Sequence, residues 1–400
     1  MRALPTDGLR SNATTLMLLG LLWLSGAALR IPLLGVPPVL PLIRQSLHMS
    51  ETEVGLLMSM PLAVLAIAAI PGSLIVSRFG ATRTMIAGLA ITAVASACRS
   101  LAPGVIALYA ATIAMGFGIA IAQPALPTIV RAWLPARPGV ATAAFTNGSL
   151  LGAVCTSWLT IPLVLPWVGN SWRLTLAVWA IPVIVAAVIF VVGAPPTAVN
   201  PATVGSRRRW WPDWKSPLTW ALGITFGVNN AIYFGINAFL PDYLHSVGEA
   251  HLVTAALTAL NMAQLVVSFI MLLAAEHLRR RAAIYLVFGP GALLGLIGIV
   301  TTSGYWTVAM VALAGFSTAI NYIVMLALPA VLSPPQDTHR TAAGMFTIGF
   351  TLPVVIPVIS GALWDMTGIG WTAFVPFMIC AVTMTVVGPM LTRFPAHREP

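Results

Sequence analysis

Residues 173–193 read RLTLAVWAIPVIVAAVIFVVG, and this stretch decides the fold class. After Arg173 it contains no charged side chain, and its length matches the about 20 apolar residues that a helix needs to cross a bilayer core of about 30 Å. The whole 400-residue chain has the same character, because 58% of its residues are hydrophobic and 8% are charged. Soluble proteins have about 25% charged residues, which cover their water-facing surface. A soluble globular fold is therefore excluded, and we expect the chain to lie in a lipid bilayer.

Other apolar segments of similar length precede and follow this one, and together they predict an all-α membrane protein with twelve transmembrane helices. The expected spans are 14–40, 52–76, 84–102, 105–130, 139–165, 173–193, 217–243, 252–275, 282–302, 305–332, 342–365 and 372–392. A transmembrane β-barrel is excluded, because these runs are too long and lack the two-residue alternation of barrel strands.

Twelve crossings place both termini on one side of the membrane, and the basic residues indicate which side. Sixteen of the 20 Lys and Arg residues fall on the side of the termini, whereas Arg44, Arg99 and Arg173 fall on the other side and Arg30 lies inside the first span. Basic residues concentrate in cytoplasmic loops, so we expect both termini to be cytoplasmic. The net charge of +10 is then a topology signal, and no nucleic-acid partner is expected.

The two ends of the chain repeat one another. Gly116-Phe117 recurs as Gly315-Phe316, Trp172 recurs as Trp371, and the tetrapeptide Phe-Thr-Asn-Gly at 145–148 recurs as Phe-Thr-Ile-Gly at 346–349. Matches that keep their order at offsets of 199 to 201 residues indicate an internal repeat. We therefore predict two parallel six-helix halves, residues 1–193 and 217–400, joined by a polar cytoplasmic linker at 194–216.

This arrangement resembles the major facilitator superfamily, whose two halves are parallel six-helix repeats. Members typically carry a Gly-x-x-x-Asp-Arg-x-Gly-Arg-Lys gating loop between the second and third helices. In the equivalent loop here Arg78 and Gly80 match and Arg83 follows, but Ser77 replaces the aspartate. The resemblance implies alternating-access transport, whereas the missing carboxylate leaves the usual gating latch in doubt.

A narrower resemblance is to the cyanate permease branch, which also includes nitroimidazole transporters. The run RIPLLGVPPVLPLIRQ at 30–45 looks like the first helix and loop of that branch, and GVNNAIYFG at 227–235 looks like its seventh helix. The resemblance implies a small, often anionic solute as cargo, no cofactor, and a plasma membrane location (the inner membrane in bacteria). We expect the monomer to be functional.

Arg30 carries the sequence-based hypothesis for the site. An arginine at the centre of a transmembrane helix costs about 2.5–3.5 kcal/mol by insertion measurements, and none of the ten acidic residues is placed to neutralise it. Its planar fork suits a carboxylate or a similar anion, which predicts that Arg30 binds substrate. Two alternatives remain open: carbonyls freed near Pro32, Pro37 and Pro38 satisfy the guanidinium, or the first span ends early and Arg30 reaches external water.

Amide and aromatic side chains within the spans are the other candidates for the cavity. The repeat places Asn229 opposite Arg30, and Asn230, Tyr233 and Asn237 share one face of the seventh helix, where amides should point inward. Further candidates are Trp23, Gln123, Asn147, Asn261, Gln264 and Asn321. The competing interpretation for each amide is hydrogen bonding between packed helices.

Two functions are compatible with these residues. The first is transport of a small anion or weakly acidic planar solute, and the alternative is efflux of neutral aromatic drug-like compounds. An enzyme is not expected, because paired carboxylates, metal-spaced His and Cys residues and an activated nucleophile are missing from the sequence. We expect Arg99 and Arg173, at the outer span ends, to be hydrated, with Arg99 as a possible attractor of anions.

Overall fold

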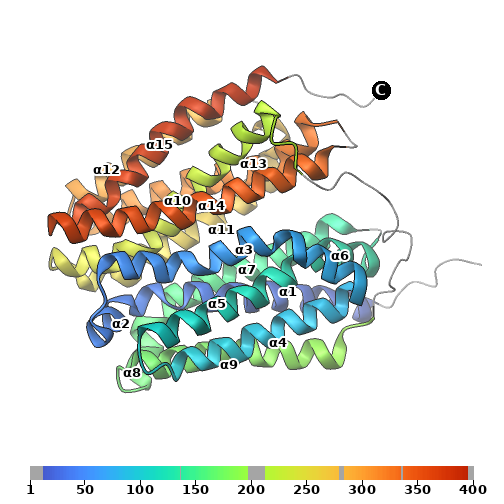
Figure 1. Ribbon diagram of the computed structural model, residues 1–400, viewed down its shortest axis with the longest axis horizontal. Helices are drawn as coiled ribbons and strands as arrows, with labels where there is room; N and C mark the ends of the chain where they lie inside the picture. The colour runs from blue at the N-terminus through green and yellow to red at the C-terminus, as the bar shows by residue number, and fades with distance from the viewer. Residues whose placement is uncertain (1–11, 136, 197–211, 279–282, 335–336, 395–400) are drawn as a thin grey trace, which may run out of the picture.

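The computed structural model describes residues 12–135, 137–196, 212–278, 283–334 and 337–394, and every regular element in these ranges is helical. Twelve helical segments run roughly along one direction of the bundle (Figure 1). Nine of the described segments are long and apolar enough to cross a membrane, and Phe288–Thr301 is a shorter apolar helix. The predicted all-α membrane fold is confirmed.

The helices of the first part of the chain follow the expected spans. They are α1 (Asn12–Leu34), η1 (Pro37–Val39), α2 (Leu40–Leu47), α3 (Glu51–Phe79), α4 (Ala81–Ser100), α5 (Val105–Ala122), η2 (Gln123–Ala125), α6 (Leu126–Trp133), α7 (Pro138–Leu159), the π-helical turn η3 (Thr160–Val164), α8 (Leu165–Trp167) and α9 (Trp172–Gly193).

The helices of the second part of the chain also follow the expected spans. They are α10 (Pro217–Ser246), η5 (Ala250–Leu252), α11 (Val253–Leu278), α12 (Ala283–Thr301), α13 (Tyr305–Leu332), α14 (Thr338–Thr367), η6 (Gly370–Phe374), α15 (Val375–Val387) and η7 (Gly388–Arg393).

The first segment differs most from the prediction, because it continues to Leu47 instead of ending near residue 40. Pro37 and Pro38 form a short 3₁₀ turn, and α2 then extends the same segment. Proline is well tolerated at the first positions of a helix, where its missing N–H group has no intrahelical partner. The prolines therefore interrupt this segment without ending it, which keeps Arg30 near its middle.

The helices pack into two groups that meet along two seams. In the first group α1 packs on α7 and α9, and α5 packs on α3 and α4; in the second, α10 packs on α14 and α15, and α13 packs on α11 and α12. The groups meet where α3 packs on α14 and α7 packs on α11. Gly55 of α3 and Gly361 of α14 lie so close to the backbone of the opposite helix that a Cβ atom has no room at either position.

The two ends of the bundle are distinguished by what they carry. The terminal end holds Asn12, Gly193, Pro217 and Arg393, and the distal end holds the turns that follow α2, α4, α8, α10, α12 and α14. In Figure 1 the C-terminus lies at the right and α2 and α8 lie at the left, so the terminal end is on the right.

Candidate substrate-binding site

Arg30 lies about midway along the first segment and donates from Nη2 to the hydroxyl of Tyr233 on α10, at 3.1 Å. Its guanidinium carbon lies 5.4 Å from the centre of the Tyr233 ring and 5.5 Å from that of Phe234. The Nε atom is buried and has no hydrogen-bond partner. Aromatic rings attract a cation through their quadrupole without neutralising its charge, so the guanidinium stays positive and partly unsatisfied.

The hydroxyl of Tyr233 continues this contact across the bundle. It donates to Oδ1 of Asn261 on α11, at 2.6 Å, and the Asn261 amide donates to Oγ of Ser157 on α7, at 2.8 Å. The chain of hydrogen bonds therefore joins α1 and α7 of one helix group to α10 and α11 of the other. Sequence reasoning selected Arg30, Tyr233 and Asn261 separately, and the structure brings them together.

Tyr322 of α13 completes the aromatic surroundings of Arg30. It interacts electrostatically with both Arg30 and Tyr233, and its ring lies 5.4 Å from that of Phe226. Its side chain is 39% exposed. Tyr322 was not among the sequence candidates. Its neighbour Asn321 was, so the dipeptide Asn321-Tyr322 pointed to this position of α13.

The contacts of Arg30 do not match the alternative in which freed carbonyls satisfy its guanidinium. Among the described residues no carboxylate pairs with it, and its hydrogen bond goes to a hydroxyl group instead of a freed carbonyl. The Pro32 carbonyl accepts from Arg99 instead. The arrangement offers a fixed cation, an unused N–H donor and flat aromatic faces, which together suit a small planar anion.

The other amide candidates lie in helix packing or apart from Arg30. Asn230 donates to the Gly349 carbonyl of α14 at 3.4 Å, and Asn321 donates to Sδ of Met384 at 3.3 Å. Asn237 donates to the Tyr233 carbonyl of its own helix, and Trp23 donates to Oδ1 of Asn147 at 3.0 Å. These contacts are the interhelical and intrahelical bonds of the competing interpretation.

Three other amide candidates, Asn229, Gln123 and Gln264, differ in burial. Asn229 is 1% exposed and its Oδ1 has no hydrogen-bond partner. Gln123 begins the η2 turn and is exposed, whereas Gln264 is half-buried on α11. Their part in substrate binding stays a prediction.

The gating-loop residues lie at the terminal end between α3 and α4. Gly80 has φ of +85°, a conformation that favours glycine, and it both ends α3 and precedes α4. The Arg78 guanidinium lies 5.6 Å from the centre of the Phe79 ring, and Arg83 is exposed. The side chain of Ser77 lies outside the part of the chain whose side chains the structure describes.

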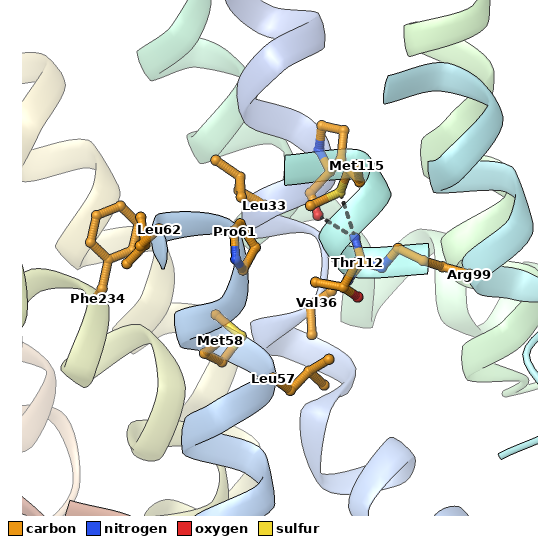
Figure 2. Close-up of a pocket in the computed structure, with 11 residues that line it drawn as sticks. Leu33, Val36, Leu57, Met58, Pro61, Leu62, Arg99, Thr112, Met115 and Phe234 are labelled. Atoms are coloured by element: carbon orange, nitrogen blue, oxygen red, sulfur yellow. Dashed lines mark hydrogen bonds between the residues drawn. The ribbon is translucent and has the colours of Figure 1, made fainter. Parts of the chain in front are cut away.

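Arg99 corrects one expectation, because it is buried instead of hydrated. Its side chain is 3% exposed and donates from Nη1 to the Pro32 carbonyl at 2.8 Å and to Sδ of Met115 at 3.0 Å (Figure 2). The residue lies near the end of α4, but α1 and α5 cover it. Arg173 behaves differently: it stacks on Trp172, donates to the Ala102 carbonyl and remains half-buried.

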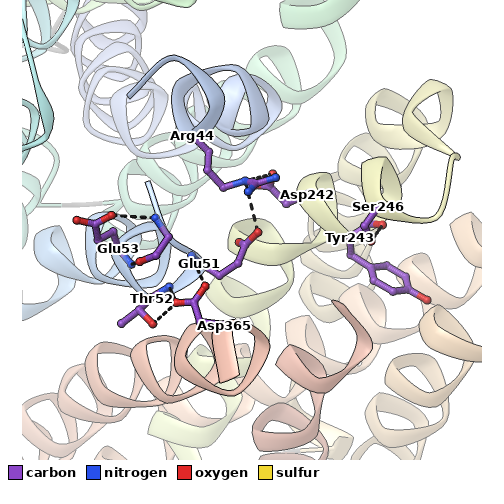
Figure 3. Close-up of polar contacts among 9 residues, drawn as sticks. Arg44, Glu51, Thr52, Glu53, Asp242, Tyr243, Ser246 and Asp365 are labelled. Atoms are coloured by element: carbon purple, nitrogen blue, oxygen red, sulfur yellow. Dashed lines mark hydrogen bonds and ion pairs between the residues drawn. The ribbon is translucent and has the colours of Figure 1, made fainter. Parts of the chain in front are cut away.

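The distal end carries a charged cluster that sequence reasoning missed, and we call Arg44, Glu51, Asp242 and Asp365 the distal cluster. Arg44 of α2 lies 2.8 Å from Asp242 of α10 and 3.4 Å from Glu51 of α3 (Figure 3). Asp365 of α14 accepts from the backbone N–H groups of Glu51 and Thr52, at 2.9 and 2.8 Å. The cluster therefore ties the two helix groups together at this end.

The distal cluster holds more negative than positive charge. Glu51 is 4% exposed and Asp242 is 1% exposed, and each has one carboxylate oxygen without a partner. Burial and the neighbouring Asp242 carboxylate raise the pKa of Glu51 to about 8, against the opposing effect of Arg44. The signal for this cluster was three acids at span ends, Glu51, Asp242 and Asp365, but spacing alone does not show which span ends meet.

The family model of the Major Facilitator Superfamily matches residues 18–356 of the chain. The chain belongs to the Major Facilitator Superfamily. It is therefore a secondary membrane transporter and not an enzyme, as the sequence predicted.

Relatives with named cargo cover nearly the whole chain. The cyanate transport protein CynX of Escherichia coli is 27% identical over 91% of this chain and 94% of its own length. The 2-nitroimidazole transporter of Escherichia coli is 24% identical over 94% and 96%. Among solved structures, a bacterial homologue of the human lysosomal transporter Spinster is 16% identical over 97% of both chains, with a TM-score of 0.72. The resemblance to the cyanate permease branch agrees with these relatives.

Proposed function

We propose that this transporter moves a small anion or a weakly acidic planar solute by alternating access, and that Arg30 binds the negatively polarised group of the cargo. The observation that carries the proposal is the mid-height guanidinium of Arg30, which has an unpartnered Nε atom and no paired carboxylate among the described residues. A cationic cargo would need a carboxylate at this height, so cations are disfavoured.

The surroundings of Arg30 support a flat cargo. Tyr233 and Phe234 present aromatic faces to the guanidinium, and the Asn261 amide supplies hydrogen-bonding capacity beside Tyr233. Of the cargoes named for the two relatives, cyanate is a small linear anion and 2-nitroimidazole is a small planar ring, and both are suited to such a site. Their chemistry defines the class that we propose here, without choosing between them.

Alternating access requires that the two halves, residues 1–193 and 217–400, move relative to each other about the bound cargo. The hydrogen bonds from Arg30 to Tyr233 and from Asn261 to Ser157 cross between these halves, so a cargo that replaces either bond changes the contact between them. The positive-inside asymmetry supports a cytoplasmic terminal end. A phosphatase reporter fused after residue 400 should then be inactive in cells, and an active fusion would reverse the orientation.

The test is flux of cyanate and of 2-nitroimidazole into liposomes that contain the purified transporter. Arg30→Gln removes the charge while keeping a polar side chain, and we expect at least a tenfold loss of transport, because one charge-assisted hydrogen-bond pair contributes about 1.5–3 kcal/mol. Arg173→Gln is the matched control, since Arg173 also lies over an aromatic ring, that of Trp172, but is placed at the distal end.

Two results of this assay would decide against the proposal. Wild-type flux by Arg30→Gln would remove Arg30 from the mechanism. Transport of neutral aromatic compounds without anion flux would favour the efflux alternative, in which Arg30 only supports the structure.

A further inference from the structure

A second guanidinium, that of Arg99, lies within the bundle without a carboxylate partner among the described residues. Its two hydrogen bonds, to the Pro32 carbonyl and to Sδ of Met115, both use the Nη1 atom, and its Nε atom is buried without a partner. A carbonyl and a thioether are neutral acceptors, so the full positive charge remains uncompensated. A buried charge in this state is expensive unless a counterion reaches it.

A small pocket beside Arg99 provides the place for such a counterion. Pro32, Leu33, Met58, Arg99, Thr112 and Phe234 are among the residues that line it (Figure 2). Thr112 is 1% exposed, and its hydroxyl group also has no hydrogen-bond partner. Arg99 and Thr112 therefore both line this pocket, and each has a buried polar atom without a partner. Buried donors of this kind are rare in folded proteins and often mark an unseen ligand.

The size and walls of the pocket restrict the ligand. The space has room for about one water-sized particle, which is too little for sulfate, phosphate or a carboxylate of several atoms. Met58 and Met115 are flexible and polarisable, so they can adjust around a soft ion slightly larger than water. A single water molecule would satisfy one donor but would leave the charge uncompensated.

We propose that Arg99 and Thr112 hold a chloride-sized monovalent anion in this pocket. The site is separate from the proposed cargo site, but Phe234 connects the two, because its ring faces the Arg30 guanidinium and also lines the pocket. Arg30 and Pro32 are two residues apart on α1, so the bound anion lowers the positive potential that Arg30 experiences. The proposal therefore assigns the transporter a resident inorganic anion in addition to its cargo.

The test compares the melting temperature of the purified transporter in sodium chloride, sodium bromide and sodium gluconate at equal ionic strength. Gluconate is too large for the pocket, so we expect a melting temperature several degrees higher in either halide, since a ligand that binds the folded state stabilises it. Thr112→Val should reduce this halide effect by at least half. Arg99→Leu should abolish it and should melt higher than the wild type in gluconate, because it removes an uncompensated charge.

The controls separate this site from others. Thr219→Val makes the same change at another buried hydroxyl group without a partner, on α10, and should keep the full halide effect. Arg30 does not line this pocket, so Arg30→Ala should retain most of the halide effect, and it should do so even if the cargo proposal fails. A halide effect of wild-type size in Thr112→Val and Arg99→Leu, or equal melting of the wild type in all three salts, would overturn the proposal.

Discussion

At the scale of single residues, the proposed binding of cargo depends on what surrounds Arg30. Its two aromatic contacts and the Tyr233 hydroxyl offset part of the insertion cost of about 2.5–3.5 kcal/mol, since a desolvated cation–π contact contributes about 2 kcal/mol. The sequence alone predicted Arg30 and Tyr233 as candidates for the binding site, because a charge or a polar stripe inside an apolar span is conspicuous. It misjudged Arg99, because position near a helix end does not show whether neighbouring helices cover the side chain.

Tyr233→Phe tests the hydroxyl that links Arg30 to Asn261. The ring and its cation–π contact remain, but the hydrogen bonds at 3.1 and 2.6 Å are lost. Each such bond contributes about 0.5–1.5 kcal/mol, so the loss of both should raise the apparent KM of cyanate transport in liposomes by about 5- to 150-fold. Tyr305→Phe, at a side chain that is 78% exposed, is the control. An unchanged KM in Tyr233→Phe would show that the hydroxyl has no part in binding.

At the scale of helices, composition and apolar length predicted nearly every span, because a membrane requires long apolar helices whatever the tertiary contacts. The first segment was the exception, since its proline turn does not end the helix. Which helices meet could not be predicted in this way. The distal cluster arises because α2, α3, α10 and α14 bring their ends together, and their acids are far apart in sequence.

The distal cluster predicts a pH dependence with a definite sign. Since the pKa of Glu51 is raised from 4.5 to about 8, the folded state binds more protons than the unfolded state between these values. Stability from this group is therefore complete below about pH 4.5 and is lost as the pH rises toward 8. We expect the melting temperature of the wild type to fall from pH 6 to pH 8.5 by more than that of Glu51→Gln.

Glu53→Gln is the matched control for this comparison. Glu53 lies two residues away and accepts from the Ser50 backbone N–H in the capping box of α3. Its variant should keep the wild-type pH dependence. Parallel pH profiles for the wild type and Glu51→Gln would contradict the assignment of the buried proton to Glu51.

At the scale of the whole molecule, the two helix groups are joined at the distal end by ion pairs and at mid-height by the Arg30–Tyr233 and Asn261–Ser157 bonds. The sequence repeat predicted two similar halves, but it could not predict at which end of the bundle side chains join them. Transporter states differ by only a few kcal/mol and share one sequence, so periodicity and composition carry no information about the state. Contacts between the halves are what distinguish the states.

The most direct measurement of the central claim is ligand-induced stabilisation at constant chloride and constant pH. Cyanate and 2-nitroimidazole should raise the melting temperature of the wild type and of Arg173→Gln, because bound cargo stabilises the folded transporter. We predict that Arg30→Gln folds and melts cooperatively, but that neither compound raises its melting temperature. A rise in Arg30→Gln equal to that of the wild type would contradict this prediction.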